Sequence, residues 1–341
     1  MPETDQAGEQ HPDVVWMDGE LVPFAEANVH VLSNGLLYGA GVFEGVRCHA
    51  TDRGPAVFRL DDHLRRLNDS MRIYLAALPH PVEVLAHGVI DTVRANGYSD
   101  CYVRPIVWMG PGLDPLAATL HTAIACWPWE NYHAGADTAG AIRVKVSSFS
   151  RVDANAMPTA AKATGQYLNT FLAKVDALLA GYDEAVLLNS GGMVADGTAE
   201  NVFAVRDGVI TTPPTVDGAL GGITRDTVIV LARALGYEVR EASLRRSDLY
   251  VADEVFLTGT AAGVAPVRDV DGRPPAAGAP GPATQALRRL YADVVGGRVS
   301  DWAHWLHYVD GGPVGRGDCQ HVVDGALIAA PLLGAVIDER V

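Results

Sequence analysis

Residues 158–167 read Pro158-Thr-Ala-Ala-Lys162-Ala-Thr-Gly-Gln-Tyr167, a run of small residues around one lysine. Lysine is scarce in this chain of 341 residues, in which Lys145, Lys162 and Lys174 stand against twenty-three arginines. Arginine stays protonated, so it cannot replace lysine as an amine nucleophile or in a Schiff base. Small neighbours leave space around an amine, so Lys162 is a candidate reactive group. An ordinary surface lysine is the alternative.

Bulk composition predicts a two-domain cytoplasmic protein. A chain of 341 residues exceeds what one hydrophobic core normally serves. The net charge of −15 argues against nucleic acid or an anionic membrane as a partner, because both reward a basic surface. The acidic, polar start of the chain is not a signal peptide, and no apolar run approaches the ~18–20 residues of a membrane span.

The four cysteines are widely spaced and form no CxxC or zinc-ligand pattern. We expect buried thiols in a reducing compartment and no metal site. The cysteines are Cys48, Cys101, Cys126 and Cys319.

Alternating strand and helix patterns predict an α/β fold. Strands are expected at 14–17, 20–23, 101–109, 122–127, 141–146, 184–188 and 254–258, and helices at 61–78, 81–96, 167–181, 225–236 and 283–295. Asp18-Gly19 and Asp207-Gly208 predict hairpin turns. The loop 128–140 separates a small N-terminal domain, 1–127, from a larger C-terminal domain, 141–310. Residues 311–341 form a tail without a clear element, for which the sequence gives no role.

Two turns and one arginine are candidates for holding a phosphate. Residues 219–226, Ala-Leu-Gly-Gly-Ile-Thr-Arg-Asp, run directly into a predicted helix, whose N-terminus adds about half a positive charge. Thr224 can donate a hydroxyl hydrogen there. The turn 258–262, Thr-Gly-Thr-Ala-Ala, and Arg59 are the other candidates. Each one alone is equally compatible with a capped helix start, a plain turn or a surface ion pair.

Three carboxylates occupy promising positions: Glu44, Asp196 and Glu200. Asp196 lies in a turn-rich stretch that returns to a strand. A protonated ring nitrogen of a ligand needs such a carboxylate partner. Solvation or helix capping is the alternative for each residue.

From about Val14 to Asp310 the chain resembles the branched-chain amino-acid aminotransferases. These are pyridoxal 5′-phosphate enzymes of fold type IV, which share the two-domain architecture of D-amino-acid aminotransferase. Each matching segment alone is modestly specific to the family, but all of them together, in the family's order along the chain, make the resemblance highly specific. The segments are 38–47 (YGAGVFEGVR), 57–59 (VFR), 102–105 (YVRP), 127–129 (WPW), 158–162 (PTAAK), 200–203 (ENVF), 222–226 (GITRD), 252–256 (ADEVF) and 259–262 (GTAA).

The resemblance implies roles for individual residues. Lys162 forms the Schiff-base link to the cofactor and later moves the proton between Cα and C4′. Asp196 faces the pyridine nitrogen, and Tyr167 lies near the phenolic oxygen. The phosphate is held by Arg59, Thr224, Thr260 and the backbone at Ile223. Substrate-pocket positions are Tyr38, Phe43, Tyr102, Arg104, Trp129, Tyr132, Ala261 and Ala262.

The resemblance also implies the reaction and the assembly. An amino group passes between a branched-chain L-amino acid (leucine, isoleucine or valine) and 2-oxoglutarate, so the partners are small amino acids and 2-oxo acids. Arg104 would receive the second carboxylate of the acceptor. Because Tyr38 can come from the neighbouring subunit, a homodimer is the smallest unit implied, with a hexamer of dimers as a larger option.

Departures from the family pattern leave other activities open. Asp196 stands where the family has glutamate, Gly221 stands where proline is common, and the loop Gly110–Thr119 is short. D-amino-acid transaminases, amine transaminases and a lyase acting on aminodeoxychorismate share the fold. A specialised transaminase for an unusual amino acid or amine in secondary metabolism is one alternative. A cofactor-binding protein with little turnover is an alternative from another class.

Overall fold

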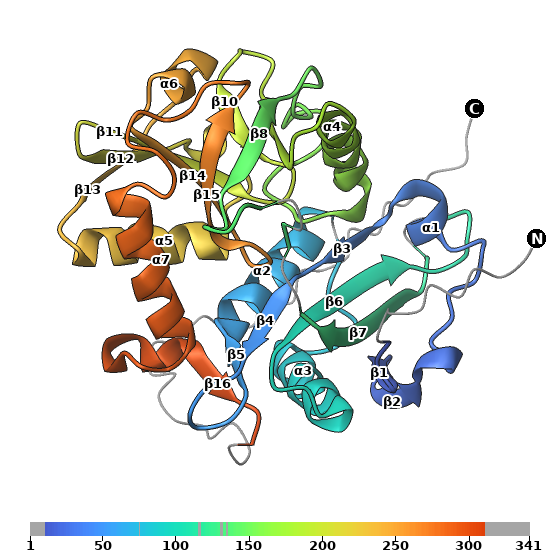
Figure 1. The fold of residues 1–341 in the computed structure, drawn as a ribbon. Coiled ribbons are helices and arrows are strands. Elements are labelled where there is room, and N and C mark those ends of the chain that lie inside the picture. The colour runs from blue at the N-terminus through green and yellow to red at the C-terminus, as the bar shows by residue number, and fades with distance from the viewer. Residues whose placement is uncertain (1–10, 75, 115–116, 130–131, 134–135, 311–341) are drawn as a thin grey trace, which may run out of the picture. The chain divides into compact units, whose positions relative to one another are not determined.

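The strands of the described chain form two sheets of eight strands each. The computed structural model describes residues 11–310 apart from 75, 115–116, 130–131 and 134–135. Both sheets belong to one compact unit that ends at Asp310, whereas the tail 311–341 lies outside the described residues. Figure 1 shows the first sheet in blue to teal, with the red strand β16 at its edge, and the second in green to orange. The prediction of an α/β fold is confirmed.

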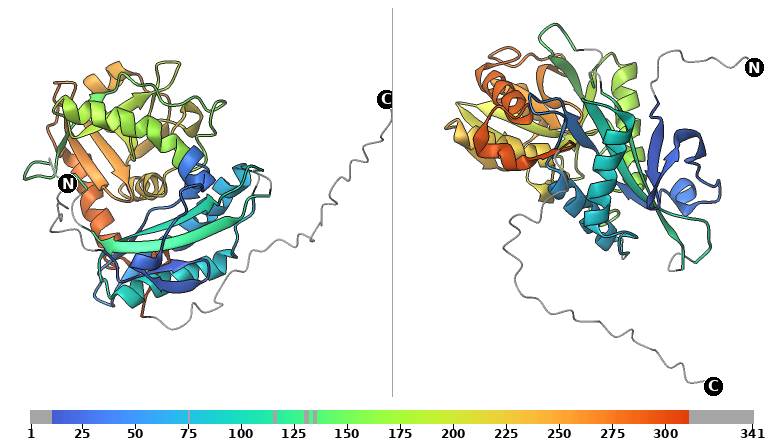
Figure 2. Two further views of the ribbon diagram at one scale, coloured as in Figure 1. Left: turned by 90° about the vertical axis from the view of Figure 1, so that its right-hand side faces the viewer. Right: turned by 90° about the horizontal axis from the view of Figure 1, so that it is seen from below.

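The first sheet is antiparallel throughout and consists of β1 (Val14–Met17), β2 (Glu20–Pro23), β3 (Gly41–Phe43), β4 (Val46–His49), β5 (Ala56–Phe58), β6 (Cys101–Met109), β7 (Leu120–Pro128) and β16 (Leu306–Tyr308). Its order is β16-β5-β4-β6-β7-β1-β2, and β3 pairs with β6. The long pair β6 and β7 lies side by side in both views of Figure 2. The predicted β1–β2 hairpin is confirmed, and Asp18 and Gly19 both have positive φ at its turn.

Two helices, α2 (Leu60–Ile73) and α3 (Val82–Asn96), pack against the first sheet. Leucines of both helices share a buried cluster with strand residues such as Val103. Each fully buried leucine contributes about 1.5–3 kcal/mol. The prediction for α3 is confirmed, including its end at Gly97, which has a φ of 69°.

The prediction that the first of these helices reaches Leu78 is wrong, because α2 ends at Ile73. Ala76 and Leu78 still pack against the buried cluster, but from non-helical chain, so the apolar pattern outlasts the helix. Pro79 and Pro81 follow directly, and a proline disfavours helical conformation in the residue before it.

The second sheet is mixed and consists of β8 (Ile142–Val146), β9 (Glu184–Leu188), β10 (Val194–Gly197), β11 (Asn201–Arg206), β12 (Val209–Thr212), β13 (Glu238–Glu241), β14 (Glu254–Gly259) and β15 (Gly263–Val270). Its order is β10-β9-β8-β15-β14-β11-β12-β13. β8 runs parallel to both of its neighbours, and β12 runs parallel to β13. The strands predicted at 141–146, 184–188 and 254–258 and the hairpin at Asp207-Gly208 are confirmed.

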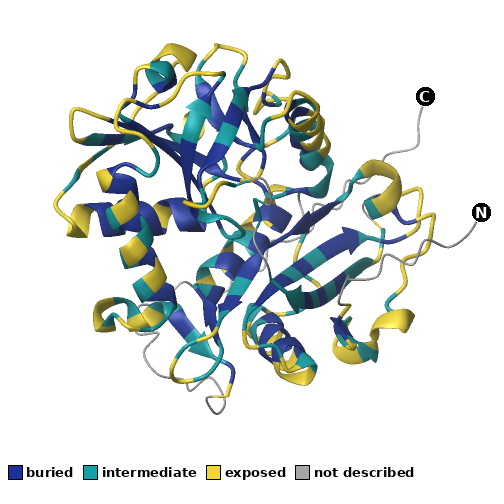
Figure 3. Cartoon of the chain, in the orientation of Figure 1, coloured by how far each residue is buried: buried dark blue, intermediate teal, exposed yellow. Residues whose placement is uncertain are grey.

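The remaining helices are α1 (Asn34–Tyr38), α4 (Tyr167–Leu179), α5 (Ile223–Ala234), α6 (Arg246–Tyr250) and α7 (Pro282–Val295), and short 3₁₀ helices cover Phe24–Glu26, Thr164–Gln166, Thr215–Asp217 and Ser300–Trp305. The predictions for α4, α5 and α7 are confirmed to within two residues at each end. Figure 3 shows one buried and one exposed side on α5 and α7. In the part of the chain that the structure describes, no helix is both long and apolar enough to cross a membrane.

Contacts between the two sheets bear on the predicted domain boundary. The buried cluster under α5 and α7 contains Phe203 and Phe256 of the second sheet together with Phe58 and Leu306 of the first. Leu306 belongs to β16, which pairs with β5 although it falls within the predicted domain 141–310. The division at 128–140 stays a prediction, with β16 returning to the first sheet as a structural exception.

Candidate active site

Most of the predicted site residues line one cavity of about 280 Å³. Such a volume lies near the lower end of the range for small-molecule sites, about 300–1,000 Å³. The first sheet and α2 form one part of its wall. The segment that carries Lys162, the start of α4, the turn before α5, and strands and turns of the second sheet form the rest. The predicted residues that line it are Phe43, Tyr102, Arg104, Trp129, Tyr132, Lys162, Tyr167, Asp196, Ile223, Thr224, Thr260 and Ala261.

Lys162 reaches the cavity from a firmly held backbone. Its N–H donates to Ser70 Oγ at 3.0 Å, and its carbonyl accepts the N–H of Phe43 at 3.0 Å. The neighbouring residues Ala161 and Ala163 are buried, as the small-residue run predicts. The Lys162 amine lies 2.6 Å from the Tyr167 hydroxyl. The alternative of an ordinary surface lysine is therefore wrong.

The other two lysines have structural partners. Lys145 pairs with Asp176 at 2.8 Å, and Lys174 pairs with Glu184 at 2.7 Å. Lys162 is thus the lysine whose amine faces a hydroxyl and an open cavity instead of a carboxylate. An amine placed in this way is available as a nucleophile or a base.

Asp196 lies on β10 at the opposite wall and is buried. One carboxylate oxygen lies 3.3 Å from Arg151 Nε, and the other accepts the N–H of Leu220 at 3.3 Å. Burial raises the pKa of Asp196 to about 6, although Arg151 and the Leu220 N–H favour the charged form. Oδ1 has no aligned hydrogen-bond donor, so it can still accept a hydrogen bond from a protonated ligand nitrogen.

The turn before α5 presents backbone N–H groups to the cavity. Ile223 and Thr224 begin the helix, so their N–H groups have no intrahelical partner. The Asn201 side-chain amide donates to Leu220 O at 2.8 Å and fixes the turn from one side. A Cβ on Gly222 would lie 2.0 Å from Asn201 Oδ1, so the turn requires glycine there. This helix N-terminus is a suitable place for an anion.

Arg59 and Arg66 both lie near the turn before α5. Arg59 Nη1 donates to Thr227 Oγ1 of α5 at 3.1 Å, and its guanidinium pairs with Asp62 and Asp226, but Arg59 is not among the residues that line the cavity. Its contact with a phosphate stays a prediction. Arg66, two helical turns further along, lines the cavity and donates to Gly221 O at 2.8 Å.

Glu44 is the fully buried carboxylate that holds Arg66. It accepts from Arg66 Nε at 2.7 Å and Nη2 at 2.8 Å, and it contacts His63 Nδ1 at 2.7 Å. Burial alone would raise the pKa of Glu44, but Arg66 and His63 hold it well below its usual range. Glu44 is therefore charged and orients Arg66 without itself facing the cavity.

Arg104 provides a second cationic group, surrounded by aromatic rings. Its guanidinium carbon lies 4.7 Å from the centre of the Phe43 ring and 5.3 Å from that of Tyr102. Trp129 forms the next part of this wall, stacked on Tyr102 and donating to Ala261 O at 3.2 Å. The wall combines apolar ring faces with one charge, so it suits aliphatic and acidic groups alike.

Two expected pocket residues do not line this cavity. Tyr38 ends α1, is 76% exposed and is not among the residues that line the cavity of its own chain. Ala262 lines a neighbouring hollow of about 1,030 Å³, which it shares with Ala261, Trp129 and Tyr132.

Sequence reasoning missed Arg66 and Arg151. The sequence places Arg66 on the same helical face as His63 and Ser70, but only the structure shows that this face is buried against the cavity wall. Arg151 had no such signal, because it follows β8 in an irregular segment and meets Asp196 only in three dimensions.

Comparison with known proteins identifies relatives along most of the chain. The family model for amino-transferase class IV matches residues 41–270. The branched-chain-amino-acid aminotransferase of Escherichia coli (strain K12) is 41% identical over 302 residues, which cover 87% of this chain and 98% of that protein. A solved structure of the T.th. branched-chain amino acid aminotransferase with N-(5′-phosphopyridoxyl)-L-glutamate is 44% identical, with a TM-score of 0.82 over 88% of this chain and 99% of the other. The same enzyme with 4-methylvaleric acid gives a TM-score of 0.83, with 44% identity and the same coverage.

Proposed function

Because this chain belongs to the class IV aminotransferases, we propose that it is a pyridoxal-phosphate-dependent aminotransferase that moves an amino group between a branched-chain L-amino acid and 2-oxoglutarate. The observation that carries this proposal is the Lys162 amine, which faces the cavity 2.6 Å from the Tyr167 hydroxyl. Pyridoxal phosphate, when bound, supplies a protonated ring that withdraws electrons from the substrate Cα.

The residues present fit this cofactor at each of its polar groups. The N-terminus of α5, with Thr224, Thr260 and Arg66, would hold the phosphate. Asp196, whose Oδ1 has no hydrogen-bond donor, would hold the ring nitrogen. Tyr167 would contact the phenolic oxygen and Lys162 the aldehyde carbon. These residues belong to one cavity, so a single ligand can meet them all.

The chain's own groups can then perform the proton transfer. Lys162 would act as the base that takes the proton from the substrate Cα, and as the acid that delivers it to C4′ of the cofactor. The Tyr167 hydroxyl orients the amine between these steps. Asp196 keeps the ring nitrogen protonated, since a carboxylate beside a pyridinium favours the charged form.

A shared pocket must accept both an aliphatic side chain and a second carboxylate. The aromatic wall formed by Phe43, Tyr102 and Trp129 would pack against leucine, isoleucine or valine. Arg104, which lies among the same rings, would bind the second carboxylate of 2-oxoglutarate. The solved complexes of the T.th. enzyme, one with a phosphopyridoxyl-glutamate and one with 4-methylvaleric acid, support this double use.

We further infer that the working unit is at least a homodimer. Exposed apolar side chains crowd α1 and α4, and Gly165 N–H donates to Gly39 O between the two helices. Tyr38, which is not among the residues that line its own cavity, would complete the pocket of the partner subunit. The three described cysteines are all buried and free, which is typical of the cytoplasm.

The proposal is tested by profiling amino donors and 2-oxo-acid acceptors with the purified, cofactor-loaded protein. We expect leucine, isoleucine and valine to be the best donors and 2-oxoglutarate an efficient acceptor, and Lys162→Ala to abolish turnover. D-amino acids and simple amines belong in the same panel. A clear preference for one of these would replace the proposed substrate class. Absence of turnover with every donor would favour a cofactor-binding protein.

A further inference from the structure

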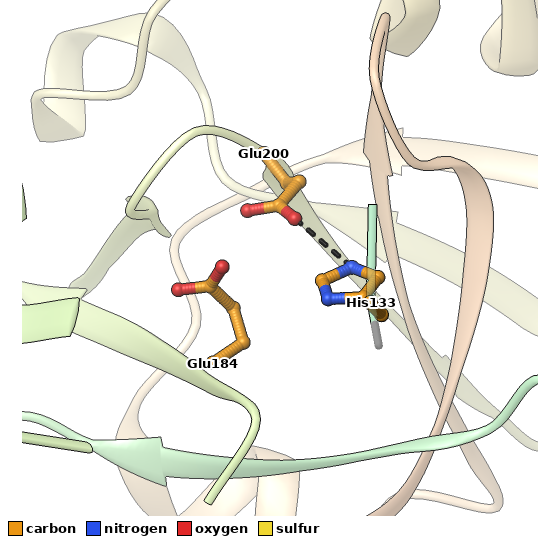
Figure 4. Close-up of side chains that lie close together, drawn as sticks. All are labelled: His133, Glu184 and Glu200. Atoms are coloured by element: carbon orange, nitrogen blue, oxygen red, sulfur yellow. Dashed lines mark ion pairs between the residues drawn. The ribbon is translucent and has the colours of Figure 1, made fainter. Parts of the chain in front are cut away.

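A cluster of titratable side chains lies beside the cavity at His133, Glu184 and Glu200. One potential ligand atom from each residue lies within 4.8 Å of those of the other two. Figure 4 shows the imidazole and the two carboxylates arranged around a common space. Glu184 begins β9 and Glu200 immediately precedes β11, while His133 belongs to the segment that carries Trp129 and Tyr132. Three separate parts of the chain thus meet at this point.

His133 is buried without a hydrogen-bond partner. Its side chain is 7% exposed, and neither Nδ1 nor Nε2 makes a hydrogen bond within the described residues. Nε2 lies 3.2 Å from Glu200 Oε1, which also lacks a hydrogen bond. The two atoms lie within ion-pair distance, as the dashed line in Figure 4 marks, but neither makes an aligned hydrogen bond. A buried polar group without a hydrogen bond costs about 1–3 kcal/mol.

The distance between these two atoms fits joint coordination of a metal ion. A hydrogen bond between nitrogen and oxygen prefers about 2.9–3.0 Å and a straight N–H···O line. Two ligands of a tetrahedral zinc ion, at about 2.0–2.2 Å from the metal, lie about 3.3–3.5 Å from each other. The observed 3.2 Å without hydrogen-bond alignment is close to that spacing.

The charges of the cluster leave room for a cation. Lys174 pairs with Glu184 Oε2 at 2.7 Å, and Glu184 Oε1 accepts from Thr198 Oγ1 at 2.6 Å and from the N–H of Ala185 at 2.7 Å. One ammonium thus faces two buried carboxylates.

We propose that His133, Glu184 and Glu200 bind one divalent transition-metal ion of the zinc class, with water in the remaining position. Imidazole with carboxylate suits zinc and its neighbours, whereas magnesium favours oxygen ligands alone. The ion would join the segment that carries Trp129 and Tyr132 to the second sheet. It would therefore stabilise one wall of the cavity without contacting the reacting atoms.

The test is metal binding by the full-length, cofactor-loaded protein after dialysis against a chelator. Co²⁺ and Zn²⁺ are added separately, and retained metal is measured after gel filtration together with the visible bands of tetrahedral Co²⁺. We expect one retained equivalent in the wild type. His133→Leu should lose at least about tenfold in affinity, the smaller end of the loss that even an outer-shell partner causes.

A matched control is His121→Leu, which removes another histidine–carboxylate pair, that with Asp18 at 2.8 Å. This variant should retain metal as the wild type does. Lys174→Met should bind metal more tightly than the wild type, because it removes the ammonium that competes for Glu184. If His133→Leu does not fold, this second variant tests whether the cluster binds metal.

Three outcomes would overturn the site: no metal retained by the wild type, equal retention by His133→Leu and the wild type, or weaker binding by Lys174→Met. The contact of His133 with Glu200 would then account for the cluster without a metal ion.

Discussion

At the scale of single residues, Arg104 is a cation held by ring faces and therefore still able to bind a carboxylate. Its guanidinium carbon lies 4.7 Å from the Phe43 ring centre, and Nε has no hydrogen-bond partner. Replacing Arg104 by alanine removes a charge-assisted contact worth about 1.5–3 kcal/mol, or about 10–150-fold in affinity. We expect the KM for 2-oxoglutarate to rise by such a factor, while the KM for leucine changes much less. Steady-state kinetics with both substrates measure the difference.

The control for Arg104→Ala is Arg72→Ala, which removes an exposed arginine that pairs with Asp69 three residues away. Such exposed pairs contribute little, so this variant should keep wild-type kinetics for both substrates. Equal losses for leucine and 2-oxoglutarate in Arg104→Ala would contradict the role assigned to Arg104.

Asp196 should make the stability of the cofactor-free protein depend on pH. Burial raises its pKa from 3.8 to about 6 in the folded chain. A raised pKa means that folding favours the protonated form of Asp196. The contribution of this residue to the free energy of unfolding is therefore complete below about pH 4 and is lost as the pH rises to about 6. The upper limit is about 3 kcal/mol. Asp196→Asn cannot titrate, so its free energy of unfolding should decline less over this window.

Urea unfolding of both proteins between pH 4 and pH 7 checks the Asp196 prediction. Glu184 also has a raised pKa, but it is present in both proteins and cancels in the difference. Parallel stability profiles would show that Asp196 has an ordinary pKa.

Single residues also show how far sequence reasoning extends. Lys162 could be identified because its scarcity and its small neighbours are properties of the sequence itself. Arg66 could not be identified in the same way, because α2 carries three arginines and only the packed helix shows that Arg66 lines the cavity. Arg66 reaches it through a bond to Gly221, a residue 155 positions away. Such a distant contact leaves no local pattern.

At the scale of elements, the turn that leads into α5 depends on one of its two glycines. A Cβ on Gly222 would lie 2.0 Å from Asn201 Oδ1, whereas a Cβ on Gly221 would meet its nearest atom at 3.9 Å. Gly222→Ala should therefore displace the Asn201 amide from Leu220 O and weaken cofactor binding by about tenfold or more, the effect of one lost hydrogen bond of about 1.5 kcal/mol. Fluorescence titration with pyridoxal phosphate measures the affinity.

Gly221→Ala is the matched control for the α5 turn. The site has room for a methyl group, and its φ is not in the left-handed region, so binding should stay within about twofold of the wild type. If both variants bound the cofactor equally well, the close approach of Asn201 would not govern the turn.

Long elements could be predicted and short ones could not, for a physical reason. α3, α4, α5 and α7 each span three turns or more, so their apolar faces repeat often enough to be recognised. β3, β4 and β5 have only three or four residues each: β3 and β5 are buried throughout, and the alternation of β4 is too short to be recognised. α2 was predicted too long because packing continued after the helix had ended.

At the scale of the whole molecule, the order of motifs indicated the fold, but the pairing of distant segments did not follow from it. β16 pairs Leu306 with Phe58, nearly the whole described chain apart. The hydrophobic pattern of a strand cannot specify which strand it pairs with, because many strands have the same apolar face. The association of subunits depends in turn on the side chains exposed at the surface of the folded chain.

α4 carries exposed apolar side chains that are suited to a subunit interface. Leu168 is 65% exposed and Phe171 is 62% exposed, and both lie on the exposed side of the helix. Figure 3 shows exposed surface on α4 and on α1 alike. Contiguous apolar patches of this kind on a folded protein indicate a partner surface. Burying each large side chain would stabilise a dimer by about 1.5–3 kcal/mol.

Phe171→Glu should therefore dissociate the protein, because it places a charge inside the buried surface. Analytical ultracentrifugation at micromolar concentration should find a dimer for the wild type and a monomer for the variant. Since Tyr38 would then be missing from each pocket, turnover should fall together with the dimer fraction. Val251→Glu changes an apolar side chain that is 55% exposed at the end of α6, and it should leave both properties unchanged. A fully active monomeric Phe171→Glu would mean that each chain completes its own pocket without Tyr38 of a partner.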